Sequence, residues 1–144
     1  MNYENFRIDI TKIFVDPPVM KPPDRKPTDA ELGILRILWS RGPSTVRDVA
    51  AAMGREDAYT TVLKLLQIMT DKQLVRRNES ARTHIYEAAH TEAQMQQHLV
   101  ADLLDRAFDG SAATLVMRAL SAKKTSAKDL AEIRKLLQSK EVKK

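Results

Sequence analysis

Cysteine is absent from the sequence, which excludes disulfide bonds, thiolate metal sites and cysteine nucleophiles from its chemistry. No apolar run approaches the roughly 18–20 residues that a membrane-spanning helix requires. The first residues include acidic side chains and lack an unbroken apolar core, which is not the pattern of a secretory signal. We therefore expect a cytoplasmic protein that does not insert into membranes.

Residues suited to catalysis or cofactor binding are few and scattered. The three histidines, His84, His90 and His98, do not have the spacing of a metal-ligand set. The four glycines form no phosphate-binding loop, and no serine lies in a nucleophile elbow. We therefore expect no enzyme, no bound metal and no cofactor.

The composition instead indicates a small, basic, globular protein. Its net charge of +5 over 144 residues leans mildly toward nucleic acid or anionic surfaces. Five of the six prolines lie between residues 17 and 27, so we predict that residues 1–27 form an extended arm. A disordered tail, a short docked strand and an upstream extension before a natural start at Met20 all remain open for this arm.

Residues 28–90 have the pattern of a winged helix-turn-helix domain. A capping box, Thr28-x-x-Glu31, predicts the start of the first helix. Glycines and further caps predict three helices, and alternating residues predict a hairpin. The expected helices span about residues 28–41, 45–53 and 58–72, and the expected strands span residues 74–77 and 84–86.

The third helix has two distinct faces. Val62 lies at the centre of its apolar face when residues advance by about 100° each, and Leu66 lies beside it. Thr60, Lys64 and Gln67 fall on the opposite face. A helix that enters the major groove of DNA needs small hydrogen-bonding and basic side chains on its outer face.

Positive charge is concentrated in the predicted hairpin. Residues 72–84 include four basic residues and one acidic residue, whereas residues 28–90 include nine basic and eight acidic residues. A solvated edge that discourages sheet pairing is the alternative reading of such a hairpin. Together, the helix face and the hairpin predict a DNA-binding surface. Its predicted members are Tyr59, Thr60, Thr61, Lys64, Gln67, Lys72, Arg76, Arg77 and Arg82.

Residues 91–144 predict three amphipathic helices with a lysine-rich end, and a second capping box, Thr91-x-x-Gln94, predicts the start of the first of them. A segment this short, with Phe108 as its one aromatic residue, cannot bury its apolar stripes well within one copy. We therefore expect a dimerisation domain, and a helical lid on the winged domain is the alternative. The predicted dimer residues are Met95, Leu99, Leu103, Leu104, Phe108, Leu115, Leu120, Leu130, Ile133 and Leu137. The expected fold is mainly α with a small β-hairpin: a winged helix-turn-helix domain followed by a three-helix dimerisation domain.

Three motifs give the chain a family resemblance. Residues 58–62 (AYTTV), residues 74–77 (LVRR) and the opening Thr28-x-x-Glu-Leu-x-Ile-Leu-x-x-Leu-Trp39 resemble the BlaI/MecI penicillinase-repressor family, over roughly residues 28–138. The resemblance implies a bacterial transcriptional repressor that binds inverted-repeat operator DNA as a homodimer and blocks the promoter. Many members are encoded beside a membrane metalloprotease sensor, which makes such a sensor a candidate partner.

Several residues depart from the family's pattern. The cleavage region of the family aligns with Asp102-Leu103, where the Asn-Phe pair of the resistance members is absent. The turn after the third helix is Lys72-Gln73 instead of Lys-Gly, so we predict a left-handed backbone at Gln73. A small-molecule-responsive winged-helix regulator and a protein-interaction module that does not bind DNA remain the alternative functions.

Overall fold

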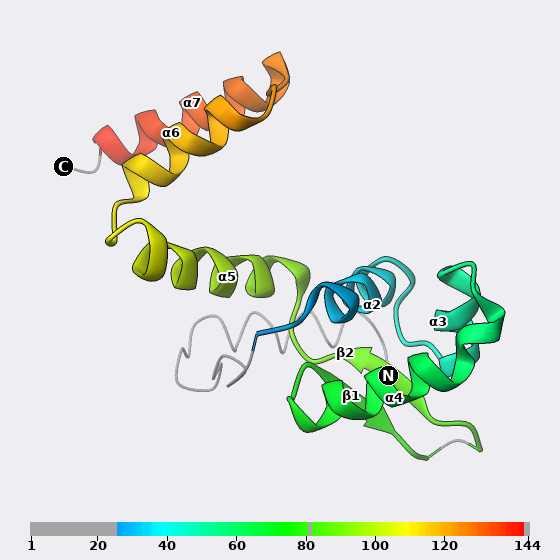
Figure 1. The fold of residues 1–144 in the computed structure, drawn as a ribbon. Coiled ribbons are helices and arrows are strands. Elements are labelled where there is room, and N and C mark those ends of the chain that lie inside the picture. Colours follow the sequence, from blue (N-terminus) through cyan, green and yellow to red (C-terminus); the bar gives the residue numbers. More distant parts are fainter. Residues whose placement is uncertain (1–25, 81, 143–144) are drawn as a thin grey trace. The chain divides into compact units, whose positions relative to one another are not determined.

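The computed structural model describes residues 26–80 and 82–142. Most of the predicted amino-terminal arm, including Met20, lies outside these residues. The described elements are helices and one two-stranded antiparallel sheet, which confirms the predicted fold class (Figure 1). In chain order they are α2 (Asp29–Arg41), α3 (Val46–Ala52), the 3-10 turn η2 (Glu56–Ala58), α4 (Tyr59–Asp71), β1 (Val75–Asn78), β2 (Ile85–Ala88), α5 (Glu92–Ala107), α6 (Ala112–Ala122) and α7 (Ala127–Val142).

Two compact units make up the chain, and the boundary between them falls between Leu99 and Val100, inside α5. The division predicted from the sequence falls after residue 90. The first turns of α5 belong to the winged-helix unit because Met95, 1% exposed, lies in the core of that unit. Helix α5 is therefore continuous across the boundary between the two units.

Side-chain caps fix where the helices begin. At α2 the Glu31 amide donates to Thr28 Oγ1 at 3.2 Å, and the Thr28 amide donates to Glu31 Oε1 at 2.9 Å. The same reciprocal pair joins Thr91 and Gln94 at the start of α5. Each pair satisfies amide groups that the first helical turn leaves without a backbone acceptor. The predicted capping boxes at these two helices are confirmed.

The core of the winged-helix unit lies between the helices and the hairpin. Each of α2, α3 and α4 contributes three buried apolar residues at helical spacing, and the hairpin and α5 add four more. These residues are Ile34, Leu35, Leu38, Val46, Val49, Ala50, Val62, Leu66, Met69, Leu74, Val75, Tyr86 and Met95.

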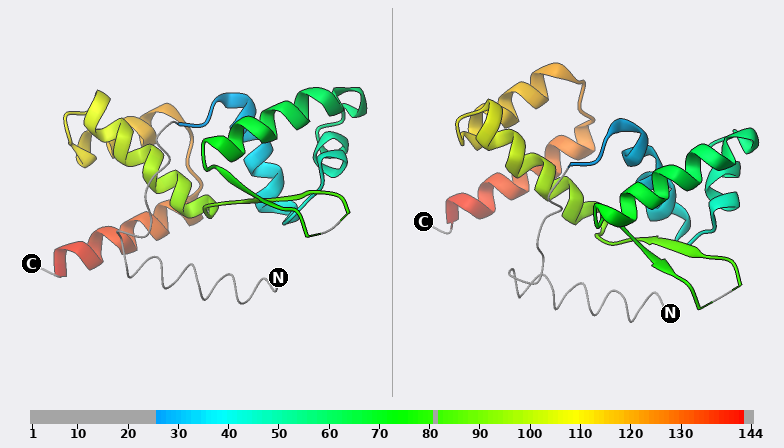
Figure 2. Two further views of the ribbon diagram at one scale, coloured as in Figure 1. Left: turned by 90° about the horizontal axis from the view of Figure 1, so that it is seen from below. Right: turned by 60° about the horizontal axis from the view of Figure 1, so that its bottom comes forward.

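The hairpin is held on both sides of β2. On one side β2 pairs with β1, with Arg77 opposite Tyr86. On the other side Ser44 forms an isolated bridge with Tyr86, donating its amide to the Tyr86 carbonyl at 2.9 Å and accepting the Tyr86 amide at 2.8 Å. The turn between α2 and α3 therefore anchors the hairpin, which runs back alongside α4 (Figure 2).

The turn from α4 into β1 requires a left-handed backbone. Gln73 has a φ of 64°, which confirms the conformation predicted for this position. Its amide bonds to the Thr70 carbonyl at 3.1 Å, and the Leu74 amide bonds to the Met69 carbonyl at 2.9 Å. A glycine adopts such a φ without the steric cost that a Cβ atom brings.

The second unit buries little of its apolar surface. No residue of α6 is buried, and large apolar side chains of all three helices stand exposed. The exposed ones from residue 100 onward are Val100, Leu103, Val116, Met117, Leu120, Leu136 and Leu137. Within the ranges that the structure describes, no helix is both long and apolar enough to cross a membrane.

Replacing Gln73 by glycine should stabilise the protein. The change removes a left-handed strain of about 1–2 kcal/mol but adds about 0.4–1 kcal/mol of unfolded-chain entropy, so we expect a net gain of up to about 1.6 kcal/mol. Gln73→Val should destabilise, because a β-branched side chain tolerates a positive φ poorly. Urea unfolding followed by circular dichroism measures both changes, and a less stable glycine variant would contradict the strain argument.

Candidate nucleic-acid interface

One face of α4 is polar and open to solvent, and its opposite face lies in the core. Val62, Leu66 and Met69 are fully buried, and they hold the helix in a single rotational setting. The residues predicted to read DNA, Thr60, Thr61, Lys64 and Gln67, are all exposed, as is Tyr59. Within the described residues Lys64 forms no ion pair, so its ammonium is available to an external anion.

The sequence-based prediction missed one apolar member of this surface. Ile68 is 40% exposed on α4, one turn after Lys64. Its place on the helix is the signal that was available, since residues four apart share a face. An apolar side chain beside polar ones gives the surface a group able to contact a thymine methyl group.

The hairpin arginines differ in how firmly they are held. Arg76 donates to the Ala89 carbonyl at 3.2 Å, and Arg77 forms an ion pair with Glu79. The Tyr86 hydroxyl, and then the charge of Glu79, raise the pKa of Arg77 above its usual value. Arg82 is exposed and has no ion pair among the described residues. Exposed ion pairs such as the one between Arg77 and Glu79 contribute little stability and rearrange easily.

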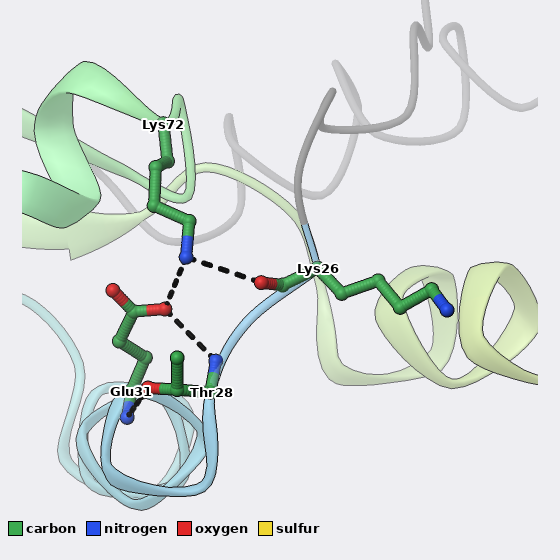
Figure 3. A network of polar contacts seen from close by, with 4 residues as sticks. All are labelled: Lys26, Thr28, Glu31 and Lys72. Carbon is green, nitrogen blue, oxygen red and sulfur yellow. Dashed lines mark hydrogen bonds and ion pairs between the residues drawn. The ribbon is translucent and has the colours of Figure 1, made fainter.

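Lys72 has a different role from the predicted one. Its ammonium lies 2.6 Å from Glu31 Oε1 and also donates to the Lys26 carbonyl at 3.1 Å (Figure 3). The two paired side chains are 9% and 2% exposed. Both contacts are to α2 or to the chain before it, so the ammonium of Lys72 is occupied by contacts within the protein. The prediction that it contacts phosphate is therefore withdrawn.

Glu31 is the residue of this network whose importance the sequence analysis underestimated. Burial by itself would raise its pKa, but hydrogen bonds from Lys72 and Thr28 and the charge of Lys72 outweigh burial and lower the pKa below its usual value. The sequence marked Glu31 only as a cap. No local signal shows the pairing, because Glu31 and Lys72 are 41 residues apart.

The structure separates the predicted dimer residues into two groups. Met95 is buried in the core of the winged-helix unit and is therefore not free to form a dimer contact, whereas Leu99 is half-buried and packs against that core. The other eight belong to the second unit and are exposed or half-buried. They are Leu103, Leu104, Phe108, Leu115, Leu120, Leu130, Ile133 and Leu137.

Two of the three histidines meet in space. The rings of His90 and His98 contact edge to face with centroids 5.9 Å apart, and Trp39 donates its indole N–H to the His90 carbonyl at 2.9 Å. In the part of the chain that the structure describes, no group of three or more His, Cys, Asp or Glu residues has the geometry of a metal site. The Trp39 hydrogen bond therefore links α2 to the turn before α5, and the ring contact links that turn to His98 within α5.

Known proteins resemble this chain in sequence. The penicillinase repressor family matches residues 27–139. The chain belongs to this family. The resemblance predicted from the sequence is thereby confirmed, and the family consists of transcriptional repressors and not of enzymes.

Individual members of the penicillinase repressor family and one solved structure are also similar. The protein described as transcriptional regulator BlaI, in two strains of Mycobacterium tuberculosis (CDC 1551 / Oshkosh and ATCC 25618 / H37Rv), is 38% identical over 84 residues, which cover 56% of this chain and 61% of the relative. The adhesin competence repressor AdcR from Streptococcus pyogenes is 19% identical over 96% of this chain and 95% of its own, with a TM-score of 0.37. A TM-score this low carries no weight for the arrangement of the units.

Glu31→Gln in this member of the family should lower the free energy of unfolding by about 1–3 kcal/mol near pH 7, because the cap survives but a buried ammonium loses its anion. The pKa of Glu31 is lower in the folded protein than its reference value of 4.5. Its contribution is therefore complete above about pH 4.5 and is lost as the pH falls through the folded pKa. We expect the wild type to lose stability across this range more steeply than the variant.

Urea unfolding between pH 3 and pH 7 measures this difference. Glu132→Gln is the matched control, because Glu132 is exposed and pairs with Lys135 on the surface. Parallel pH curves for the wild type and Glu31→Gln would show that the carboxylate of Glu31 contributes nothing specific.

Proposed function

We propose that the protein is a bacterial transcriptional repressor that occupies operator DNA as a homodimer, with α4 in the major groove and the hairpin against the phosphate backbone. The observation that carries this proposal is the exposed polar face of α4, backed by a fully buried apolar face and flanked by an arginine-bearing hairpin. Membership of the penicillinase repressor family supports it.

The side chains on α4 suit the reading of base edges. Lys64 and Gln67 are exposed and one turn apart, so both reach outward from the same face. Lysine pairs with the acceptors of guanine, and glutamine pairs with the acceptor and donor of adenine. Thr60, Thr61 and Tyr59 at the start of α4 serve base edges or flanking phosphates in this proposal.

The hairpin cations suit contact with phosphate. Arg76, Arg77 and Arg82 are exposed, and the ion pair that Arg77 forms with Glu79 can be exchanged for phosphate oxygens at little cost. Because Lys72 is no longer counted as a phosphate contact, three arginines per protomer give about six neutralised phosphates in a dimer. The logarithm of the binding constant should then fall with the logarithm of salt concentration with a slope of about −5.

The second unit supplies the reason for a dimer. Its exposed apolar side chains form stripes on amphipathic helices, and monomeric soluble proteins rarely leave such stripes uncovered. A second copy covers them around a two-fold axis and presents two copies of α4 to half-sites about 34–36 Å apart. Repression then follows from occupation of the promoter.

A membrane metalloprotease sensor enters only through the family resemblance. Asp102 and Leu103, which align with the family's cleavage region, lie inside α5, and Asp102 accepts a hydrogen bond from Arg106 at 3.4 Å. A protease binds its substrate as an extended strand. Cleavage here would therefore require α5 to unwind locally.

Lys64→Ala and Gln67→Ala should change which sequence is preferred, each with a loss of about 1–3 kcal/mol on the cognate site. Arg82→Ala should instead weaken all duplexes alike and reduce the magnitude of the salt slope by about two, one per protomer. Selection from a random duplex pool, followed by binding titrations at several salt concentrations, measures both effects. Equal losses on every sequence for both classes would show that the two surfaces are assigned wrongly.

The same titrations separate the alternative functions. Absence of any preferred duplex for the wild type would favour a protein-interaction module. Release from the selected operator by a small molecule would favour a ligand-responsive regulator.

Leu137→Glu should shift the protein from dimer to monomer at micromolar concentration. Leu137 is 54% exposed on α7, and a carboxylate there would have to be desolvated in a helical interface. Gln138→Glu, at the exposed neighbouring position, introduces the same charge as a control. Light scattering measures the masses, and an unchanged dimer for Leu137→Glu would exclude this face of α7 from the interface.

A further inference from the structure

The ion pair between Lys72 and Glu31 lies at the carboxyl end of α4, just before the hairpin begins. Lys72 follows the last residue of α4 and precedes the left-handed turn at Gln73, after which β1 begins. Its ammonium contacts Glu31 Oε1 at 2.6 Å and the Lys26 carbonyl at 3.1 Å (Figure 3). Both acceptors belong to the beginning of α2 or to the chain just before it.

A comparison within the chain shows that the cap does not require the charge of Glu31. The capping box of α5 has Gln94 at the equivalent place, and the Thr91 amide donates to Gln94 Oε1 at 2.9 Å. The Thr28 amide donates to Glu31 Oε1 at the same distance. A neutral amide thus satisfies the same backbone group, and the carboxylate at residue 31 needs another explanation.

Stability alone is a weak explanation for this charge. A buried ion pair must offset the desolvation of both partners, and its replacement by neutral groups of similar volume is often neutral or stabilising. Orientation is a better one. A charge-assisted hydrogen bond at 2.6 Å is directional, whereas apolar packing of Val62, Leu66 and Met69 is not.

We infer that Lys72 and Glu31 are positioning residues for the reading of DNA. They fix the carboxyl end of α4 and the start of β1 against the amino end of α2, and they do not contact the DNA themselves. This inference rests on the proposed function. It assigns a basic residue next to the recognition surface to the interior of the protein, and it gives an acidic residue a favourable effect on the binding of a polyanion.

The last point makes the inference testable by charge. If only net charge mattered, Glu31→Gln would strengthen DNA binding, because it removes a negative charge. We expect the opposite result. Glu31→Gln should bind the selected operator about tenfold more weakly, a loss within the coupling range of contacting residues. Its binding to scrambled duplex should change by less than about twofold. Asp48→Asn is the matched control, since Asp48 is an exposed carboxylate in the capping box of α3.

Lys72→Met separates positioning from phosphate contact. A positioning lysine leaves the salt slope of operator binding unchanged, whereas loss of a phosphate contact reduces its magnitude by about two per dimer, as Arg82→Ala should. The double variant Glu31→Gln/Lys72→Met should lose no more operator affinity than the weaker-binding single variant, because both residues act through one pair. Independent roles would multiply the two losses.

The experiment measures the wild-type chain, these variants, the control Asp48→Asn and the comparison variant Arg82→Ala against selected and scrambled duplex at four salt concentrations. Circular dichroism and thermal unfolding identify variants that fail to fold, and the double variant, whose buried groups are neutral, covers that case. A reduced slope for Lys72→Met, tighter operator binding by Glu31→Gln, or full discrimination by a folded double variant would each overturn the inference. A wild type without sequence preference would overturn the proposed function itself, and the inference with it.

Discussion

Two buried charges, on Glu31 and Lys72, set the constraint on which the winged-helix unit depends. An ionised group removed from water is costly unless it is paired and its remaining hydrogen-bonding capacity is used. Here the ammonium reaches both Glu31 and the Lys26 carbonyl, and the carboxylate also accepts the Thr28 amide. These contacts can be made together only when the end of α4 lies against the beginning of α2. The apolar core favours compaction, and the polar network adds a direction to it.

The same helix serves the core and the exposed surface. Val62, Leu66 and Met69 are buried, while Lys64 and Gln67 point away from them. A rotation or slide of α4 would therefore disturb both the packing of the core and the proposed recognition of DNA. The bridge between Ser44 and Tyr86 extends this coupling, because it ties the hairpin to the turn between α2 and α3. The candidate interface is thus a property of the whole unit and not of one helix.

Local signals in the sequence were enough for the elements but not for their connections. The capping boxes at Thr28 and Thr91 and the left-handed turn at Gln73 depend on residues within a few positions, and the structure confirms them. The pairing of Lys72 and the bridge at Ser44 join residues about forty positions apart. Side-chain type and spacing carry no information on such distant partners, and a lysine beside arginines was for that reason assigned to the DNA.

The apolar stripe of α5 shows the same limit from another side. Met95, Leu99 and Leu103 repeat at intervals of four residues, so periodicity assigns all three to one face and one partner. In the structure Met95 is buried in the winged-helix core, Leu99 packs against that core, and Leu103 is exposed. The first part of the stripe therefore packs in the winged-helix unit, and the later part is exposed. Its later part, like the stripes of α6 and α7, is apolar and exposed. In the proposed dimer, a second copy related by a two-fold axis would supply a matching stripe without any new sequence.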